Sequence, residues 1–445
     1  MKRVLGFLVF SAMFAATANA SPSVAITGVT ENDGVYTISY TLAGAPAVVT
    51  FHVMTNGVET GGVTGLSGAV NRLVETEGSN TLVWDSRKDR RAEGTDATFA
   101  VRAWDRDSPP DYLVVNLLPS APSPRVTYYP DVESLPGGLL ENPIYRTTSL
   151  VMRRIHAANI TWTMAGGGSH SVTLASDYYI GVFEVTQAQW YLVFGGMSGN
   201  TPRQWTGVSF QLAGYRWMRP MEHVFIGPIR TSAIGTYDNW YPNEPEGSNT
   251  FIGKLRTLSG IDDFDLPGEA QWEYACRAGH GVDVWGDGSP FLAATDAEGH
   301  EYDVNMPGRC NYNGGVPLAS SPNYGIAESK WTDENGTATV GSFRPNSWGL
   351  YDMHGNVWEL CLDKYLANLT GFTDGRINAY LQYDADRTTV NESLVIRGGN
   401  WKENSPWQNC KSSYRGKTTT NNSTGNIGFR VICYHGLDTW TPPAE

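Results

Sequence analysis

Asp352 and Glu359 are the residues whose type and spacing most readily suggest chemistry. They stand seven positions apart in the chain, with Gly355 between them. Because glycine permits a close turn, main-chain carbonyls at this point can face inward beside the two carboxylates. Hard oxygen ligands that alternate between side chain and main chain suit Ca²⁺. The alternative interpretation is that Tyr351 and Trp358 are core aromatics and that the two acids only cap turns.

The histidines do not form a metal-binding pattern of their own. Seven of the eight follow residue 147, and none has a second histidine at His-x-x-x-His spacing. An iron oxygenase needs several His or carboxylate ligands, so this pattern argues against one. His354 has no Cys or His at ligand spacing, and we interpret it as a hydrogen-bonded structural residue.

Thiol chemistry depends on five cysteines, which are Cys276, Cys310, Cys361, Cys410 and Cys433. Thiolates are soft ligands that suit Cu(I), and in an exported protein cysteines can also form disulfides. Five cysteines cannot all pair within one chain, and their number alone does not choose among the pairings.

A stretch rich in aromatic and amide side chains, Tyr237–Asn243, is a candidate recognition segment. Aromatics together with amides suit the recognition of a peptide or a sugar in a cleft. The same residues are equally suited to packing within a loop, so both interpretations stay open.

Length and composition bound the elements that must position these residues. A chain of 445 residues predicts two domains plus a leader, and its abundant Gly, Trp and Tyr favour loop-rich extracellular domains. The net charge of −13 argues against nucleic acid or an anionic membrane as a partner, because both require a basic surface.

The first 20 residues have the pattern of a signal peptide. Lys2 and Arg3 precede an apolar run from Val4 to Ala16, and Ala18-Asn19-Ala20 follows as a cleavage signal. The run is too short to span a bilayer comfortably, and no other stretch is long enough. We therefore expect an exported protein, secreted, periplasmic or on the cell surface, without a membrane span after signal removal.

Three regions that differ in amino-acid composition follow. Residues 21–106 contain β-rich runs with alternating polarity and the tight-turn signal Asn56-Gly57, which predict a small Ig-like β-sandwich acting as spacer or binding module. Residues 107–146 are rich in Pro and Ser and predict a linker. In the region beyond, 267–279 predicts a helix that begins near Pro267, ends at Gly279 and places Trp272 and Cys276 on one face.

Five motifs lie in this third region, at residues 177–186, 266–274, 349–359, 397–401 and 426–430. Their residues and their order along the chain resemble the formylglycine-generating-enzyme and sulfatase-modifying-factor family over about residues 148–436. The resemblance implies an irregular α+β, C-type-lectin-like domain. We therefore expect this domain at 147–436, with a tail at 437–445 and the all-β sandwich before it.

The resemblance also implies site residues. It assigns one calcium site to Asp352, Gly355, Val357 and Glu359, with Gly355 and Val357 contributing carbonyls. It assigns a second site to Asn311 and the carbonyl of Tyr312, completed by Asp333 or Glu334. It further implies a disulfide between Cys276 and Cys410, for which the alternative is two buried free thiols.

One departure from the family pattern concerns the oxidase chemistry itself. Active members carry two copper-binding redox cysteines shortly after Arg-Gly-Gly, whereas this sequence has no cysteine between Gly399 and Cys410. Positions such as Glu403, Ser405 or Gln408 stand there instead, and Asn400 replaces the family's serine.

We therefore expect a bacterial-type, secreted, calcium-stabilised binding or structural module that binds no copper, with a protein or glycan as its ligand. The alternative is a formylglycine-generating or related metal-dependent oxidase, which would act on a Cys or Ser of a partner such as a sulfatase.

Overall fold

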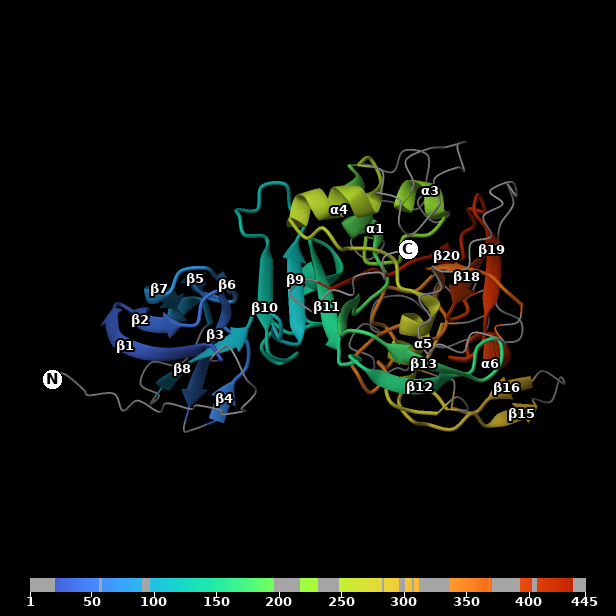
Figure 1. The fold of residues 1–445 in the computed structure, drawn as a ribbon, viewed down its shortest axis with the longest axis horizontal. Coiled ribbons are helices and arrows are strands. Elements are labelled where there is room, and N and C mark those ends of the chain that lie inside the picture. Colours follow the sequence, from blue (N-terminus) through green and yellow to red (C-terminus); the bar gives the residue numbers. More distant parts are fainter. Residues whose placement is uncertain are drawn as a thin grey trace. The chain divides into compact units, whose positions relative to one another are not determined.

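The computed structural model describes two compact units of the chain. The described residues are 21–55, 58–89, 97–195, 217–230, 248–281, 284–295, 301–305, 308–311, 337–367, 369, 393–401 and 406–434. Among them, the residues up to 115 together with 122–143 form unit 1, and 116–121 together with 144–434 form unit 2. Figure 1 shows the elements of both. The predicted signal peptide 1–20, the turn Asn56-Gly57 and the tail 437–445 lie outside the described residues.

Unit 1 is built from antiparallel sheets. One sheet has the order β1-β2-β7-β5 and the other the order β4-β3-β6, with β8 also paired to β3. Their strands are β1 (Ser23–Asn32), β2 (Val35–Ala43), β3 (Ala47–Thr55), β4 (Val58–Thr60), β5 (Leu66–Gly68), β6 (Arg72–Val74), β7 (Gly78–Asp85) and β8 (Ala97–Asp105). This all-β architecture confirms the fold class predicted for the N-terminal region.

The polarity alternation in β2 has the consequence that the sequence predicts. Ile38, Tyr40 and Leu42 are all fully buried, because a strand with a period of two presents one face to the core. They pack in one hydrophobic cluster with Phe51 of β3 and Trp84 of β7. The short 3₁₀ helix Ser86–Asp89 follows β7 directly.

The Pro- and Ser-rich stretch 107–146 contains regular structure in addition to loops. Strands β9 (Tyr112–Asn116) and β10 (Val126–Tyr129) pair antiparallel, with Tyr112 opposite Tyr129. The 3₁₀ helix Pro143–Arg146 ends the stretch. The buried apolar side chains of β9 explain why the chain is ordered here despite its prolines.

Unit 2 combines short strands with a few short helices. The described strands are β11 (Ser149–Ile155), β12 (Ile160–Met164), β13 (His170–Leu174), β14 (Tyr178–Gly181), β15 (Ala293–Thr295), β16 (Glu301–Asp303), β17 (Trp358–Lys364), β18 (Ser393–Arg397), β19 (Gly416–Thr419), β20 (Ile427–Gly428) and β21 (Ile432–Cys433). The described helices are α1 (Gln187–Phe194), α3 (Ile226–Ile229), α4 (Phe251–Ser259), α5 (Glu269–Arg277) and α6 (Pro406–Asn409). The predicted irregular α+β class is confirmed.

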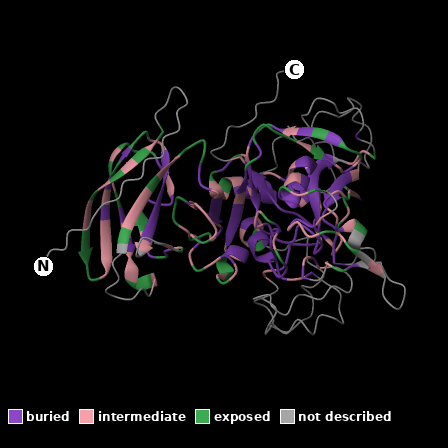
Figure 2. Ribbon diagram, turned by 90° about the horizontal axis from the view of Figure 1, so that it is seen from below, coloured by how far each residue is buried: buried purple, intermediate pink, exposed green. Residues whose placement is uncertain are grey.

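The sheets of unit 2 place three of the family-like motifs next to each other. β17, which begins inside the 349–359 motif, pairs antiparallel with β18, which ends at Arg397, and parallel with β20 in the 426–430 motif. Strand β14, from the 177–186 motif, pairs with β11 and β21. Figure 2 shows that buried residues dominate the interior of this unit.

Helix α5 lies where the sequence predicts a helix, with a different C-terminal residue. Its N-cap is Gly268, and Ala278 rather than Gly279 is the left-handed C-cap, with φ of 50°. Trp272 and Cys276 are both fully buried in the core of unit 2, as their shared helix face predicts. Within the described residues, no helix is long and apolar enough to cross a membrane.

Candidate functional site

The loop that precedes β17 holds the candidate site, and glycine makes its path possible. A parallel bridge joins Gly355 to Asn311. The Gly355 backbone has φ of 82°, and a Cβ atom there would lie 2.4 Å from the Asn311 carbonyl oxygen. No side chain fits at that distance, so only glycine allows the two segments to approach. The structure thus brings together Gly355 and Asn311, which the resemblance assigns to two separate calcium sites.

Asp352 keeps one carboxylate oxygen without a partner. Its Oδ2 accepts a hydrogen bond of 2.7 Å from the Gly341 backbone N–H. Its Oδ1 is buried and has no hydrogen-bond partner within the described part of the chain. Burial raises the pKa of Asp352 to about 6, although the Gly341 hydrogen bond and the Arg430 charge oppose the increase. An unpartnered buried carboxylate oxygen is the kind of atom that a cation can satisfy.

Glu359 is in a different situation because a guanidinium already neutralises it. Arg430 donates from Nη2 to Oε1 and from Nε to Oε2, both at 2.5 Å. The Trp272 indole N–H donates to Oε2 at 2.7 Å. Both members of the Glu359–Arg430 pair are fully buried. A calcium ion bound to Glu359 would face this guanidinium, so Glu359 does not fit the role of calcium ligand.

Glu184 is a functional-site candidate that the sequence reasoning did not single out. Its Oε2 accepts from the Asn356 side chain at 2.6 Å, and its Oε1 accepts from the Val357 backbone N–H at 3.1 Å. Burial, followed by the charges of Asp352 and Glu359, raises its pKa well above the ordinary value. Glu184 belongs to the 177–186 motif, which is the only sequence signal that could have identified it.

Val357 and Asn356 act here through groups that the sequence analysis did not consider. The Val357 backbone N–H binds Glu184, whereas the prediction concerned its carbonyl. Asn356 has φ of 62° and accepts a hydrogen bond on Oδ1 from the Ala338 backbone N–H at 2.8 Å. Hydrogen bonds from both residues therefore connect the loop to Glu184, and Asn356 also connects it to the 337–340 segment.

His354 is a structural residue in this geometry, in agreement with its interpretation from sequence. Its Nδ1 donates to the Cys410 carbonyl at 2.7 Å, and its Nε2 accepts from the Gly286 backbone N–H at 3.2 Å. Burial lowers its pKa to about 4. A neutral imidazole whose two nitrogens are both engaged is not placed to act as a general base.

The five cysteines are all buried free thiols in the structure. The Cys276 sulfur lies 3.6 Å from the Met353 carbonyl and 3.7 Å from His354 Nε2. Cys410 belongs to a separate small cluster with Cys310 and Trp285. The structure does not join Cys276 to Cys410, and that bridge stays a prediction.

A second buried charge network anchors the Arg-Gly-Gly motif. The Arg397 side chain is fully buried and pairs with Glu273 of α5. Glu273 also pairs with Arg277, and Arg415 pairs with Glu269 at 2.5 Å. The guanidinium of Arg397 stacks over the Trp272 ring, 5.3 Å from its centroid. These contacts give the motif a structural role that its sequence alone did not reveal.

Several predicted site residues lie outside the described residues. They are Tyr312, Asp333, Glu334, Glu403, Ser405 and the segment 237–243. Within the part of the chain that is described, no three His, Cys, Asp or Glu side chains are arranged to hold a metal ion. Calcium bound at Asp352 would therefore depend on main-chain carbonyls for most of its shell.

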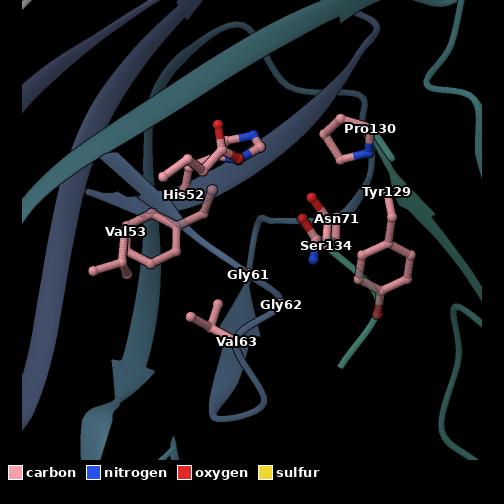
Figure 3. A pocket seen from close by; sticks show the side chains of 11 residues that line it. His52, Val53, Gly61, Gly62, Val63, Asn71, Tyr129, Pro130 and Ser134 are labelled. Atoms are coloured by element: carbon pink, nitrogen blue, oxygen red, sulfur yellow. The ribbon is translucent and has the colours of Figure 1, made fainter. Parts of the chain in front are cut away.

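Unit 1 contains a small cavity that involves a buried histidine. The cavity is lined by Phe51, His52, Val53, Glu59, Gly61, Gly62, Val63, Asn71, Tyr129, Pro130 and Ser134, most of which are labelled in Figure 3. His52 Nδ1 pairs with Glu59, and His52 Nε2 lies 3.2 Å from the Thr50 hydroxyl. The cavity volume is about 10 Å³. That is near the lower limit for a single water molecule, so this is not a ligand site.

Comparisons with known families and curated proteins agree with these motifs. The sulfatase-modifying factor enzyme 1-like domain matches residues 121–434. The chain is 26% identical over 269 residues to the chaperone protein LppX of Paenibacillus barcinonensis, covering 59% of this chain and 81% of that protein. It is 30% identical over 174 residues to the formylglycine-generating enzyme of Streptomyces coelicolor, covering 37% of this chain and 45% of the enzyme.

Two further similarities complete the comparison. A Bos taurus protein named inactive C-alpha-formylglycine-generating enzyme 2 is 28% identical over 185 residues, covering 40% of this chain and 46% of that protein. The chain thus spans less than half the length of these two formylglycine-generating relatives. Among solved structures, Treponema denticola variable protein 1 has a TM-score of 0.43 and 21% identity, covering 64% of this chain and 95% of that chain.

Proposed function

Because the chain belongs to the sulfatase-modifying factor enzyme 1-like domain family, we propose that it uses this fold as a non-oxidising binding or structural module. The observation that carries the proposal is the thiol-free segment between Gly399 and Cys410. The oxidase chemistry that the family resemblance implies needs two thiolates shortly after Arg-Gly-Gly to hold Cu(I). Without them, the domain keeps the scaffold and lacks the soft donors.

The thiols that remain are poorly suited to replace the missing pair. All five are buried, and burial raises the pKa of Cys276, Cys310 and Cys361 above the ordinary thiol value. The thiolate is the form that binds Cu(I) and attacks substrates, so the raised pKa makes Cys276, Cys310 and Cys361 weakly reactive. A relative named inactive supports the view that such domains occur without oxidase activity.

We assign a protein, rather than a glycan, as the ligand of the module. The chain spans 81% of a relative named a chaperone, which favours a protein partner. The alternative function, oxidation of a sulfatase Cys or Ser, would share the preference for a protein partner. It is disfavoured by the absence of the thiol pair.

The oxidase alternative is tested with a Cys-containing sulfatase peptide. Purified protein is incubated aerobically with copper and the peptide, with the Streptomyces coelicolor enzyme as positive control. We expect no stoichiometric Cu(I) binding and no loss of peptide thiol mass, because no exposed thiolate pair is available. Conversion of the peptide at a rate comparable to the control would overturn the proposal.

We also propose that a Ca²⁺ ion stabilises the module at Asp352, whose buried Oδ1 has no hydrogen-bond partner among the described residues. A ligand that binds only the folded state stabilises it by about 4 kcal/mol at a thousandfold excess over Kd. Millimolar Ca²⁺ should therefore raise the Tm of the wild type relative to EDTA if Kd is micromolar. Asp352→Asn should remove most of this gain, because the substitution removes the charge of the unpartnered oxygen.

The same melts distinguish Asp352 from the other predicted carboxylate. Glu359→Gln should lower the Tm in EDTA and in calcium by similar amounts, since its partner is Arg430 rather than the ion. Identical wild-type melts in EDTA and Ca²⁺, with no calcium detected by elemental analysis, would exclude the site.

A further inference from the structure

Cys310 and Cys410 form a buried pair of cysteines in unit 2; the family resemblance assigns Cys410 to a bridge with Cys276 and gives Cys310 no role. Each residue is 1% exposed, and both pack against Trp285 in one small cluster. Burial raises the pKa of Cys310, and the neighbouring Cys410 thiol also contributes to the raised pKa, in keeping with their shared cluster. Cys276 lies in the separate main core of unit 2, so Cys310 is the cysteine that shares a cluster with Cys410.

Two motif glycines create the space in which these thiols meet. At Gly399, with φ of 77°, a Cβ atom would lie 2.6 Å from the Cys410 sulfur. At Gly355, a Cβ atom would lie 3.0 Å from the Cys310 Cβ. Each cysteine therefore packs against backbone that must be glycine, and the close approach of these segments fixes the two side chains in place.

His354 keeps the third cysteine apart from the pair. Its ring binds the Cys410 carbonyl through Nδ1, while its Nε2 faces the Cys276 sulfur. The ring also packs against Trp285, with centroids 4.9 Å apart. The imidazole thus contacts Cys276 on one side and the backbone of Cys410 on the other.

We propose that Cys310 and Cys410 form a disulfide in the mature protein when it folds in an oxidising compartment. The two thiols lose two protons and two electrons, and one S–S bond forms. A disulfide oxidant, such as oxidised glutathione, accepts the electrons and protons and becomes two thiols. The bond forms during folding, because both side chains are buried in the native protein and an oxidant reaches them only before burial.

The bond would close a long loop that contains Asn311, Asp352 and Glu359 of the candidate site. A cross-link between positions 310 and 410 restricts the unfolded chain, and the stabilisation grows with loop length. For a loop of this size the Tm of the oxidised protein should exceed that of the reduced protein by roughly 5–10 °C.

Peptide mapping tests the pairing directly. The full chain, refolded with oxidised glutathione, is denatured, alkylated without reductant and digested. We expect one cross-linked peptide joining Cys310 to Cys410, with Cys276, Cys361 and Cys433 alkylated. A Cys276–Cys410 peptide, which the family resemblance implies, would overturn the assignment, as would alkylation of all five cysteines.

Thermal melts with matched variants supply a second readout. Cys310→Ala should lower the Tm of the oxidised protein and should make it insensitive to a thiol reductant. Cys361→Ala, at another fully buried thiol, should lower the Tm equally with and without reductant. Should Cys310→Ala fail to fold, the wild type alone still decides, since a reductant-independent Tm contradicts the bond.

Discussion

At the scale of single residues, the site region is dominated by carboxylates that differ in how their charge is compensated. Glu359 has a guanidinium on both oxygens, Glu184 has two neutral donors, and Asp352 has one donor and one unpartnered oxygen. A buried carboxylate without a cationic partner costs free energy to ionise, which is why the pKa values of Glu184 and Asp352 are raised. Of these three described carboxylates, Asp352 is the one that retains an oxygen without a partner, which an added cation would satisfy.

Glu359→Gln is expected to destabilise unit 2 strongly. The variant keeps the shape of the side chain but leaves the buried guanidinium of Arg430 without its counter-charge. Removing one partner of a buried ion pair typically costs about 3–5 kcal/mol. The free energy of unfolding from urea titration measures this loss.

Asp262→Asn is the matched control, because it removes one acidic charge at an exposed position of the same unit. It should change the unfolding free energy by less than about 0.5 kcal/mol. Equal effects of the two substitutions would show that Arg430 does not depend on Glu359.

At the scale of elements, Asp177 joins the end of β11 to the start of β14. Its Oδ1 accepts hydrogen bonds from the Ala157 and Ala158 backbone N–H groups at 2.8 and 2.9 Å. Its Oδ2 pairs with Arg154 at 2.8 Å and with His156 at 3.3 Å. Burial acts to raise the pKa of Asp177, but the hydrogen bonds from His156, Ala158 and Arg154 outweigh it and hold the pKa below the usual range.

Acid should therefore reduce the stability that the Asp177 contacts give to the connection between β11 and β14. Because the folded-state pKa of Asp177 is depressed, its contribution is fully present above the unfolded-state pKa, near 3.8, and is lost as the pH falls further. We expect the Tm difference between wild type and Asp177→Asn to be largest at pH 6 and to shrink between pH 4 and pH 3. A Tm difference that stays constant from pH 6 to pH 3 would contradict the depressed pKa of Asp177.

The elements that the sequence predicted correctly are those with local signals. The alternation in 35–40 predicted a buried face of β2, and Pro267 with the acidic first turn predicted α5, because these patterns act within a few residues. The C-cap was wrong by one residue: the helix ends at Arg277 and its cap is Ala278, whereas Gly279, which is also left-handed with φ of 86°, is the residue after the cap.

The contacts of the candidate site depend on residues far apart in the chain. Glu359 and Arg430 are 71 positions apart, and Glu273 and Arg397 are 124 apart. No periodicity connects such residues, so the motifs could be recognised while their partners could not. The motif positions Asp352 and Glu359 looked equivalent in sequence, and only the fold separates the unpartnered carboxylate from the neutralised one.

At the scale of the whole molecule, the family match begins at residue 121, inside the stretch predicted as a linker. The Pro and Ser residues of that stretch correctly predicted its loops, but nothing in its composition predicted the strands β9 and β10. Proline is tolerated there because the strands are short and the prolines lie outside them.

The expected export of the molecule determines whether its thiols are in an oxidising or a reducing compartment. The run Val4–Ala16 follows two basic residues and precedes Ala18-Asn19-Ala20, a pattern that signal peptidases cleave after the second small residue. The exported protein should therefore begin at Ser21, as N-terminal sequencing and intact mass would show.

The Ala20→Phe variant tests the cleavage site. It should block cleavage, because the position before the cut requires a small residue, and the protein should then stay membrane-associated at full mass. Mature protein that starts at Met1 in the cytoplasm would contradict export, and it would also place Cys310 and Cys410 in a reducing compartment where free thiols persist.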